Sequence, residues 1–591
     1  MLRNIVKLNI QFVIFIILIL FTLPFLGCEN KAPEQSIDEK LGFDPKMFEQ
    51  YLKDALTFNS WIKEENISIE SLDTLESIYI AKNFQAFLIN TLESKPTIDS
   101  IIEILGEAEL HGLNPERYNF SVIKNLFESS FNDKLKPEQR NKQLAQSEVL
   151  LIDALLKYSS DMRHGVLNPR ILYEKTHFLP VNDSLNTKYL DPVNQTNILA
   201  YLKNIQPKSI IYKNLQHALL KFKQIESIEW KQIPLTDKKI EIGQSSENIP
   251  DIFKKLVVLG LLDTAMYKTD DPLVYDSVLS NSVKVFQRIN GLISDGVIGK
   301  GTLERFNITP KQYVEKIKLN LERLRWSDYS DTARYILVNI PDFNVTIVEK
   351  QKPLFEIKAC TGRKNNWQTV TLYGQLSYFV LNPTWSVPKS IIKEEIVNGL
   401  RSDSSYLKKR NFRVYKAGER ISLDGLTAKD LASSNSYTLI QDPGAGNALG
   451  KIKFMFTNPF GIYLHDTPTR APFGYVNRAV SHGCVRIEKP MKLAEYLLSN
   501  NSNWNLDFLK IEIGQKVDDP AAKNEFARVR DSLRKGNSYG VTTEVKLTKK
   551  IPLFINYYTT WVDEDGLFNY RDDVYSRDAI LLENLKPAMS K

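Results

Sequence analysis

The chain has 591 residues, which is too long for one hydrophobic core and predicts about four domains. Its composition, 43% apolar and 25% charged residues with 26 Gly and 26 Pro, excludes disordered, collagen-like and coiled-coil proteins. The 77 Lys and Arg against 70 Asp and Glu leave a net charge of +7, or +5 without Arg3 and Lys7 near the N-terminus. This bias is too weak to indicate nucleic-acid binding.

The first 28 residues predict export. Arg3 and Lys7 precede an uncharged, largely apolar run from Leu8 to Gly27, the order of an n-region and an h-region in a signal peptide. The run ends in Phe25-Leu26-Gly27-Cys28, which resembles the lipobox of bacterial lipoproteins and implies lipidation of Cys28, although Phe25 replaces the usual leucine. About 20 apolar residues could also span a bilayer as an uncleaved anchor. Either way, we expect a protein of the cell envelope, anchored to a membrane through its N-terminus and facing the periplasm.

The next part of the chain is predicted to be helical. Residues 29–40 are polar and predict a tether, which is bounded at 29–43. Residues 44–245 repeat the spacing of amphipathic helices, as in Val149, Ile152 and Leu156. Four histidines in this part lack metal-ligand spacing and are predicted to be surface or capping residues: His111, His164, His177 and His217.

A smaller module follows. Val283, Phe286 and either Ile289 or Asn290 lie on one predicted helical face before a turn at Asp295-Gly296. A second helix is predicted to begin near Thr302. The stretch resembles the three-helix peptidoglycan-binding domain. The matching residues of its FQ…NGL…DGxxGxxT string are Phe286, Gln287, Asn290, Gly291, Leu292, Asp295, Gly296, Gly299 and Thr302. The alternative is a helical spacer without a ligand.

After about residue 330 the pattern changes to β. Residues 335–340 and 344–348 are rich in β-branched and aromatic side chains and flank Pro341-Asp342, which predicts a hairpin. Residues 386–450 are too long for a simple connection and predict an inserted subdomain or lid. The tail after 520 is polar and helical, then aromatic, and is predicted to pack back onto the sheet.

One segment, residues 458–490, carries the candidate chemistry. It contains Cys484 and two histidines, His465 and His482. A nearby imidazole can take the proton of a thiol and make it a nucleophile. Gly483 opens the backbone to a carbonyl substrate, and Arg486 could lower the thiol pKa or bind a substrate carboxylate. Spacing alone leaves open which histidine is the base, because residues two apart in an extended chain share a face.

Ser481-His482-Gly483-Cys484 matches the S/T-H-G-C signature of L,D-transpeptidases, and the segment resembles their YkuD-type catalytic domain. The resemblance implies that Cys484 is the nucleophile and that His465 is the proton acceptor, oriented by the backbone carbonyl of Asp466. The implied oxyanion and orienting groups are His482, Gly483 and Asp466, and the implied substrate-binding groups are Tyr463, Ser481 and Arg486.

The order of segments resembles the large Gram-negative branch of this family, although Val370 stands where proline is common after Thr369. We therefore expect a multidomain α+β fold. Its predicted parts are a signal peptide or anchor (1–28), a tether (29–43), an α-helical scaffold (44–245), a peptidoglycan-binding-like domain (246–308), a β-rich catalytic domain (330–520) with a capping insertion (386–450), and a C-terminal extension (521–591).

The resemblance implies an enzyme that forms 3→3 cross-links between peptidoglycan stem peptides through a thioester on Cys484, with no cofactor. Two alternatives stay open: an L,D-carboxypeptidase or hydrolase that uses the same site, and a non-catalytic wall-binding scaffold lipoprotein. A zinc site made of His465, His482, Cys484 and Asp466 is disfavoured, because structural zinc sites usually bring close pairs of cysteines. Cys360, in an apolar-flanked segment, is predicted to be a small buried hydrophobe.

Overall fold

A computed structural model of the chain describes residues 36–589, apart from 58–60, 63–66, 68, 70–71, 180–191, 266, 268, 328–331, 500, 502 and 537. The predicted leader and the lipobox with Cys28 lie outside these residues. None of the helices in the described part of the chain combines the length and the apolar character that crossing a bilayer requires. The chain divides into two compact units, Met1–Ser100 with Val122–Ile152, and Ile101–Ser121 with Asp153–Lys591. The predicted scaffold domain (44–245) is therefore shared between both units.

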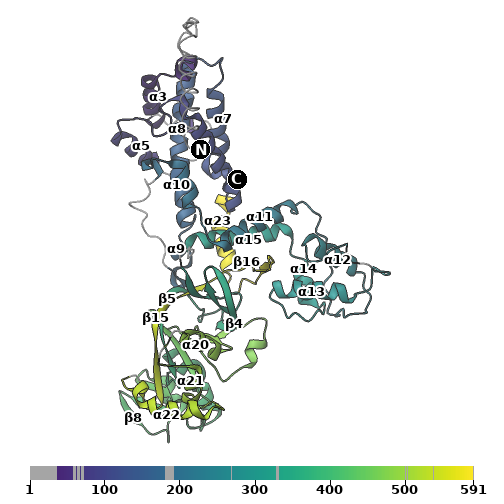
Figure 1. Cartoon of the computed structure of the whole chain (residues 1–591), viewed down its shortest axis with the longest axis vertical. Coiled ribbons are helices and arrows are strands. Elements are labelled where there is room, and N and C mark those ends of the chain that lie inside the picture. Colours follow the sequence, from purple (N-terminus) through teal and green to yellow (C-terminus); the bar gives the residue numbers. More distant parts are fainter. Residues whose placement is uncertain are drawn as a thin grey trace, which may run out of the picture. The chain divides into compact units, whose positions relative to one another are not determined.

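The first unit is helical, as predicted (Figure 1). Its core contains one buried acid, Glu148, on the long helix α8 (Pro137–His164). The Glu148 carboxylate accepts the N–H groups of Phe87 at 2.6 Å and Ile89 at 2.9 Å. These bonds fix a turn that has no helical hydrogen bonds of its own. The other helices of this unit are α2 (Ile37–Leu41), α3 (Pro45–Thr57), α5 (Leu72–Ala81) and most of α7 (Phe120–Ser130).

In the second unit, helices pack on the outside of a sheet. α11 (Ile210–Gln224) and α15 (Pro310–Trp326) share a core with Tyr335 and Phe554 of the strands. The structure corrects the prediction for two histidines, because His111 and His177 are buried rather than on the surface. The Nδ1 of His111 lies 2.9 Å from the Tyr212 hydroxyl, and the Nδ1 of His177 lies 3.0 Å from the Thr371 hydroxyl.

The predicted small module has its own core. Its helices are α12 (Ile249–Val258), α13 (Ser277–Ile289) and α14 (Lys300–Phe306). Val283, Phe286 and Ile289 are buried as predicted, and Phe286 stacks on Phe306 with ring centroids 3.9 Å apart. The buried Gln287 amide donates to the Val297 carbonyl at 2.9 Å and accepts the Gly296 N–H at 2.8 Å. The string of motif residues therefore closes this fold around Gln287.

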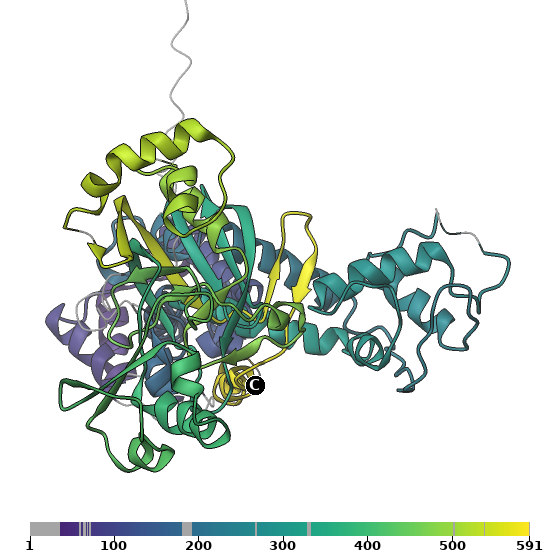
Figure 2. The same ribbon diagram turned by 90° about the horizontal axis from the view of Figure 1, so that it is seen from below.

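Eight strands form a closed ring in the order β5-β10-β11-β13-β4-β3-β2-β15, because β15 pairs with β5 as well as with β2. The predicted hairpin is confirmed as β2 (Arg334–Asn339) and β3 (Asn344–Glu349). The other strands are β4 (Lys352–Gly362), β5 (Thr371–Leu381), β10 (Ile452–Phe456), β11 (Leu464–His465), β13 (Val485–Ile487) and β15 (Thr542–Asn556). Helices α20 (Pro490–Leu498), α21 (Leu506–Glu512) and α22 (Pro520–Arg534) pack against this sheet (Figure 2).

The C-terminal segment is part of this sheet. The sequence predicts that residues 521–591 form an extension packed on the sheet, yet β15 is one of the strands of the ring (Figure 1). Helix α23 (Arg577–Met589) then packs against α15, where Asp578 pairs with Arg323 at 2.6 Å and with Lys316 at 3.1 Å. The catalytic sheet is thus completed by residues that lie beyond the predicted catalytic domain.

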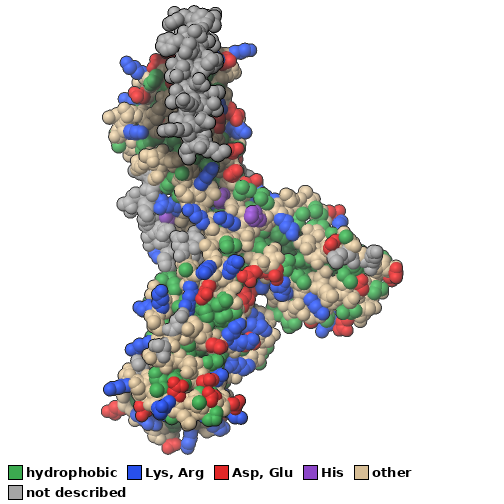
Figure 3. Space-filling model, in the orientation of Figure 1, with side chains coloured by type: hydrophobic (Ala, Val, Ile, Leu, Met, Phe, Trp, Pro, Cys, Tyr) green, Lys and Arg blue, Asp and Glu red, His purple; other side chains and the backbone are tan. Residues whose placement is uncertain are grey.

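The capping insertion (386–450) folds as a subdomain. Its sheet has the order β6-β9-β7-β8, from Trp385–Ser386, Tyr437–Gln441, Phe412–Lys416 and Glu419–Ile421. It has a separate hydrophobic core that includes Leu400, Val414 and Leu439. The surface in Figure 3 mixes basic and acidic side chains, in keeping with the small net charge.

Candidate active site

Strand pairing brings four of the predicted site residues to one face of the sheet. β11 and β13 are parallel neighbours, with Leu464 opposite Val485 and His465 opposite Arg486. Leu464 and Val485 are buried in the core of the sheet. Because side chains alternate along a strand, their neighbours point to the opposite face. The residues that share this face are Tyr463, His465, Cys484 and Arg486.

His465 is held in one tautomer. Its Nδ1 lies 2.5 Å from the backbone carbonyl oxygen of Asp466, which can only accept, so Nδ1 carries the proton. Its Nε2 has no hydrogen-bond partner among the described residues. Burial, together with the positive charge of Arg486, lowers the pKa of His465 to about 3. The imidazole is therefore neutral at physiological pH.

The backbone carbonyl of Asp466, rather than its carboxylate, contacts the His465 ring. Its carboxylate is turned elsewhere, accepting the Lys451 N–H at 2.8 Å and pairing with Arg470 at 2.5 Å. Its N–H donates to the Ile452 carbonyl at 2.9 Å. These bonds fix the carbonyl that orients His465.

Cys484 is half-buried beside Tyr463. Its Sγ lies 3.9 Å from the carbonyl oxygen of Gly461. Burial raises the pKa of the Cys484 thiol, while hydrogen bonds with Tyr463 and the charges of Lys453 and Arg486 lower it. Since the net effect is a raised pKa, the resting group is a thiol.

The Ser481-His482-Gly483-Cys484 turn is closed by its own serine. The buried Ser481 hydroxyl donates to the Cys484 carbonyl at 2.6 Å and accepts the Gly483 N–H at 3.1 Å. Gly483 has a φ of +109°, a conformation that favours glycine. Ser481, predicted to bind substrate, thus makes its hydrogen bonds within the turn and shapes it.

His482 faces the capping insertion. Its Nε2 lies 2.6 Å from Nη2 of Arg363 and 3.0 Å from Oε1 of Glu395. Its ring meets Trp367 edge to face, with centroids 4.6 Å apart. The Nε2 of His482 is therefore engaged by charged groups, unlike that of His465.

Lys453 is a site residue that the sequence analysis missed. It lies on β10 directly opposite His465, and its Nζ is 3.9 Å from the centre of the Tyr463 ring. Arg486 lies on the other side of His465, and its buried Nε has no hydrogen-bond partner among the described residues. Lys453 belongs to no motif, so only knowledge of the strand register could have identified it. The two cations make the site suited to an anionic substrate.

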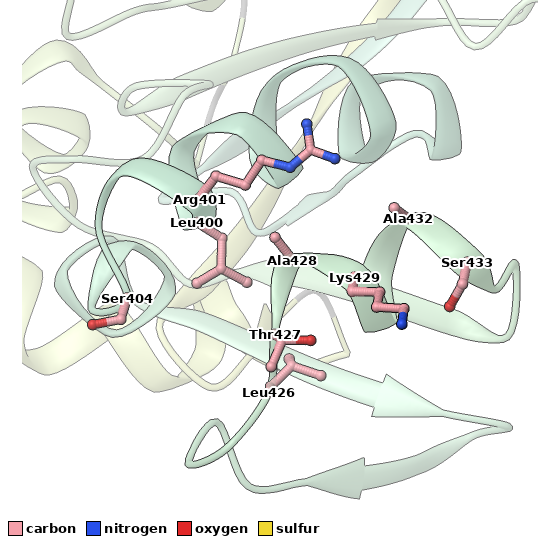
Figure 4. Close-up of a pocket in the computed structure, with 9 residues that line it drawn as sticks. All are labelled: Leu400, Arg401, Ser404, Leu426, Thr427, Ala428, Lys429, Ala432 and Ser433. Atoms are coloured by element: carbon pink, nitrogen blue, oxygen red, sulfur yellow. The ribbon is translucent and has the colours of Figure 1, made fainter.

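A pocket of about 640 Å³ lies elsewhere, in the capping insertion (Figure 4). Leu400 and Arg401 line it from α17 (Val397–Ser402), and Lys429 and Ser433 from α19 (Ala428–Ser433). It contains none of the predicted site residues. No cluster of three His, Cys, Asp or Glu side chains suited to a metal ion occurs among the residues that the structure describes.

Comparison with known proteins identifies two regions. Residues 333–518 match the family model of the L,D-transpeptidase catalytic domain (YkuD), and residues 73–219 match that of a scaffold domain. A Haemophilus influenzae protein named "Putative L,D-transpeptidase" is 28% identical over 278 residues, which cover 47% of this chain and 50% of that protein. The chain thus spans about half the length of this relative.

Among solved structures, the crystal structure of an L,D-transpeptidase (residues 123–326) from Xylanimonas cellulosilytica DSM 15894 is 13% identical, with a TM-score of 0.15. The match covers 46% of this chain and 96% of that chain. The family model thus identifies residues 333–518 as an L,D-transpeptidase catalytic domain (YkuD), and the name of the Haemophilus influenzae relative agrees with it.

Proposed function

We propose that the protein is a peptidoglycan L,D-transpeptidase that forms 3→3 cross-links through a thioester on Cys484. The supporting observation is that Cys484 and the neutral, tautomerically fixed His465 share one face of the sheet. The family match at residues 333–518 supports the reaction class.

The proposed reaction has two stages. The Cys484 sulfur attacks the carbonyl of the third, diamino-acid residue of a stem tetrapeptide, and His465 Nε2 takes the thiol proton. The C–N bond to the terminal D-alanine then breaks, and the same proton leaves with the amine. In the second stage, a side-chain amine of another stem attacks the thioester and gives its proton to His465. The thiol is regenerated as the new amide forms.

The energetics favour proton transfer that accompanies attack over a resting ion pair. Burial raises the pKa of the Cys484 thiol, whereas the pKa of His465 is lowered to about 3, so the resting thiol and imidazole are both neutral. The proton therefore moves to His465 as the sulfur attacks the carbonyl, rather than before the attack.

Three groups of the site suit the charges of this reaction. The Cys484 N–H has no acceptor among the described residues and can donate to the oxyanion that forms on the attacked carbonyl. Arg486 and Lys453 flank His465 and can bind the carboxylates that stem peptides carry.

We further propose that residues 1–28 place this site in the envelope, through a lipid on Cys28 or through an uncleaved anchor. Cell fractionation and labelling with radioactive palmitate would test this.

The nucleophile is tested by substitution. Cys484→Ala should abolish dimer formation from purified tetrapeptide muropeptides, while the buried Cys360→Ala control should retain it. Undiminished product from Cys484→Ala would remove the proposed nucleophile. If that variant still bound isolated cell wall and rescued a deletion strain, the wall-binding scaffold would be favoured.

The products separate transfer from hydrolysis. With tetrapeptide alone, 3→3 dimers identify the transpeptidase, and tripeptide without dimer identifies the L,D-carboxypeptidase.

The base is tested by His465→Gln, which we expect to lower the rate of thioester formation by about 10²- to 10⁴-fold. His482→Gln should have the smaller effect, because its Nε2 is engaged by Arg363 and Glu395.

A further inference from the structure

A tyrosine far outside the matched catalytic domain is connected to the catalytic turn. The Gly483 carbonyl accepts the Thr369 hydroxyl at 2.8 Å, and the oxygen of this hydroxyl accepts the Gly362 N–H at 2.9 Å. Thr369 donates its own N–H to the Tyr575 hydroxyl at 3.2 Å, and that hydroxyl donates to the Gly362 carbonyl at 2.6 Å. Tyr575 therefore bonds both ends of the loop 362–369, and this loop bonds the turn.

The loop 362–369 has little room to move independently of the turn. A side chain on Gly362 would place its Cβ 1.8 Å from the Trp367 carbonyl oxygen, so the loop closes on itself at this glycine. The Arg363 N–H donates to the Ser481 carbonyl at 3.0 Å. The loop thus contacts the motif at its first residue, Ser481, as well as at Gly483.

Tyr575 is itself held in place by other residues of the C-terminal segment. It is 4% exposed, and its N–H donates to the Tyr557 hydroxyl at 2.7 Å. Tyr557 donates to Asp573 at 2.6 Å, and the Arg577 guanidinium lies 5.5 Å from the Tyr575 ring. All of these residues follow residue 518, where the matched catalytic domain ends. The C-terminal segment therefore supplies a rigid hydroxyl to the loop.

The orientation of one peptide unit depends on these bonds. In a trans peptide, the Gly483 carbonyl and the Cys484 N–H point in opposite directions, so fixing the carbonyl on Thr369 also fixes the N–H. The Gly483 N–H is already used by Ser481. Glycine at position 483 gives the backbone wide freedom, so an external bond is needed to set this plane.

We propose that Tyr575 is a positioning residue for the reaction: through Thr369, it orients the Gly483-Cys484 peptide so that the Cys484 N–H meets the developing oxyanion. This inference rests on the function proposed above and adds a residue of the C-terminal segment to it. An oxyanion donor acts mainly on the transition state. Losing the Tyr575 hydroxyl should therefore lower kcat and leave KM nearly unchanged.

The test uses the full-length protein with tetrapeptide muropeptides. Tyr575→Phe should lower kcat for dimer formation by about 10- to 100-fold and change KM by less than about twofold. Thr369→Val should give the same loss, whereas Thr369→Ser, which keeps the hydroxyl, should restore kcat to within about threefold. The double variant Tyr575→Phe with Thr369→Val should be no slower than the slower single variant, because both act on one peptide unit.

The matched control is Tyr496→Phe, which removes a hydroxyl that bonds Glu349 at 2.7 Å in the same domain but away from the turn. It should retain the kcat of the native protein. A native kcat in Tyr575→Phe, additive losses in the double variant, or no recovery with Thr369→Ser would overturn the positioning role. If Tyr575→Phe fails to fold, the comparison of Thr369→Val with Thr369→Ser tests the positioning role alone. Activity that persists in Cys484→Ala would instead reject the proposed function.

Discussion

Through their positive charges, Lys453 and Arg486 lower the pKa of both reactive groups, Cys484 and His465, which helps the thiol to lose its proton but hinders the imidazole from accepting it. Lys453→Met should therefore shift the pH midpoint of Cys484 alkylation by iodoacetamide upward and slow alkylation at pH 7.5 by about three- to tenfold. Mass spectrometry of the peptide that contains Cys484 follows this rate.

The control for this substitution is Lys492→Met. Lys492 also lies over an aromatic ring, with its Nζ 4.2 Å from the centre of Phe355, but it is not among the groups that shift the thiol pKa. Its loss should leave the alkylation midpoint unchanged. An equal shift in both variants would show that net charge, rather than the position of Lys453, sets thiol reactivity.

At this scale, sequence reasoning finds the residues that a local motif holds together. Cys484 and Gly483 are adjacent in the chain, and the chemistry of a thiol beside an imidazole points to them. Spacing could not choose between His465 and His482, and the structure distinguishes them by their hydrogen-bond partners. Lys453 and Tyr575 could not be predicted, because strand pairing and a hydrogen-bonded loop bring them to the site.

At the scale of elements, the capping insertion touches the catalytic turn through a contact of modest strength. His482 pairs with Glu395, whose side chain is 49% exposed. A contact with a side chain this exposed contributes at most about 1 kcal/mol, and the insertion keeps its fold through its own core. Glu395→Gln should therefore raise KM for tetrapeptide by less than about fivefold and leave kcat nearly unchanged.

The exposed Glu419→Gln, on β8 of the same insertion, is the control and should change neither constant. A loss of kcat beyond about 100-fold in Glu395→Gln would mean that this carboxylate takes part in the chemistry through His482.

The role of residues 386–450 as a lid stays a prediction. Faster hydrolysis of the bound thioester after deletion of these residues would support it.

Elements were predictable where the signal is local. The β2–β3 hairpin follows from two apolar runs beside a turn, and the helices of the small module follow from their spacing. β15 was not predicted as a strand of the ring, because Lys546, Lys549 and Lys550 interrupt its apolar pattern. The pairing of β15 with β5 shifts register between Lys546 and Ile551, which accommodates this charged stretch. Its partners in the ring, β2 and β5, lie far away in the sequence, so no local pattern predicts this pairing.

For the whole molecule, three buried histidines should make the second unit sensitive to acid. The pKa values of His111, His177 and His465 are each lowered to about 3, mainly by burial, whereas an unfolded histidine titrates near 6.5. Between these values the unfolded chain binds more protons than the folded chain. The free energy of unfolding should therefore fall as the pH drops from about 6.5 towards 3, by about 1.4 kcal/mol per pH unit for each histidine.

Urea denaturation between pH 7.5 and 4.5 measures this slope. His177→Gln should remove about one third of the histidine contribution, because one of three buried imidazoles no longer takes up a proton on unfolding. The exposed His217→Gln should leave the slope as it is. A free energy of unfolding that stays constant from pH 6.5 to 5, or a slope equally reduced in both variants, would contradict the account. Either result would mean that these imidazoles already bind a proton in the folded protein over this pH range.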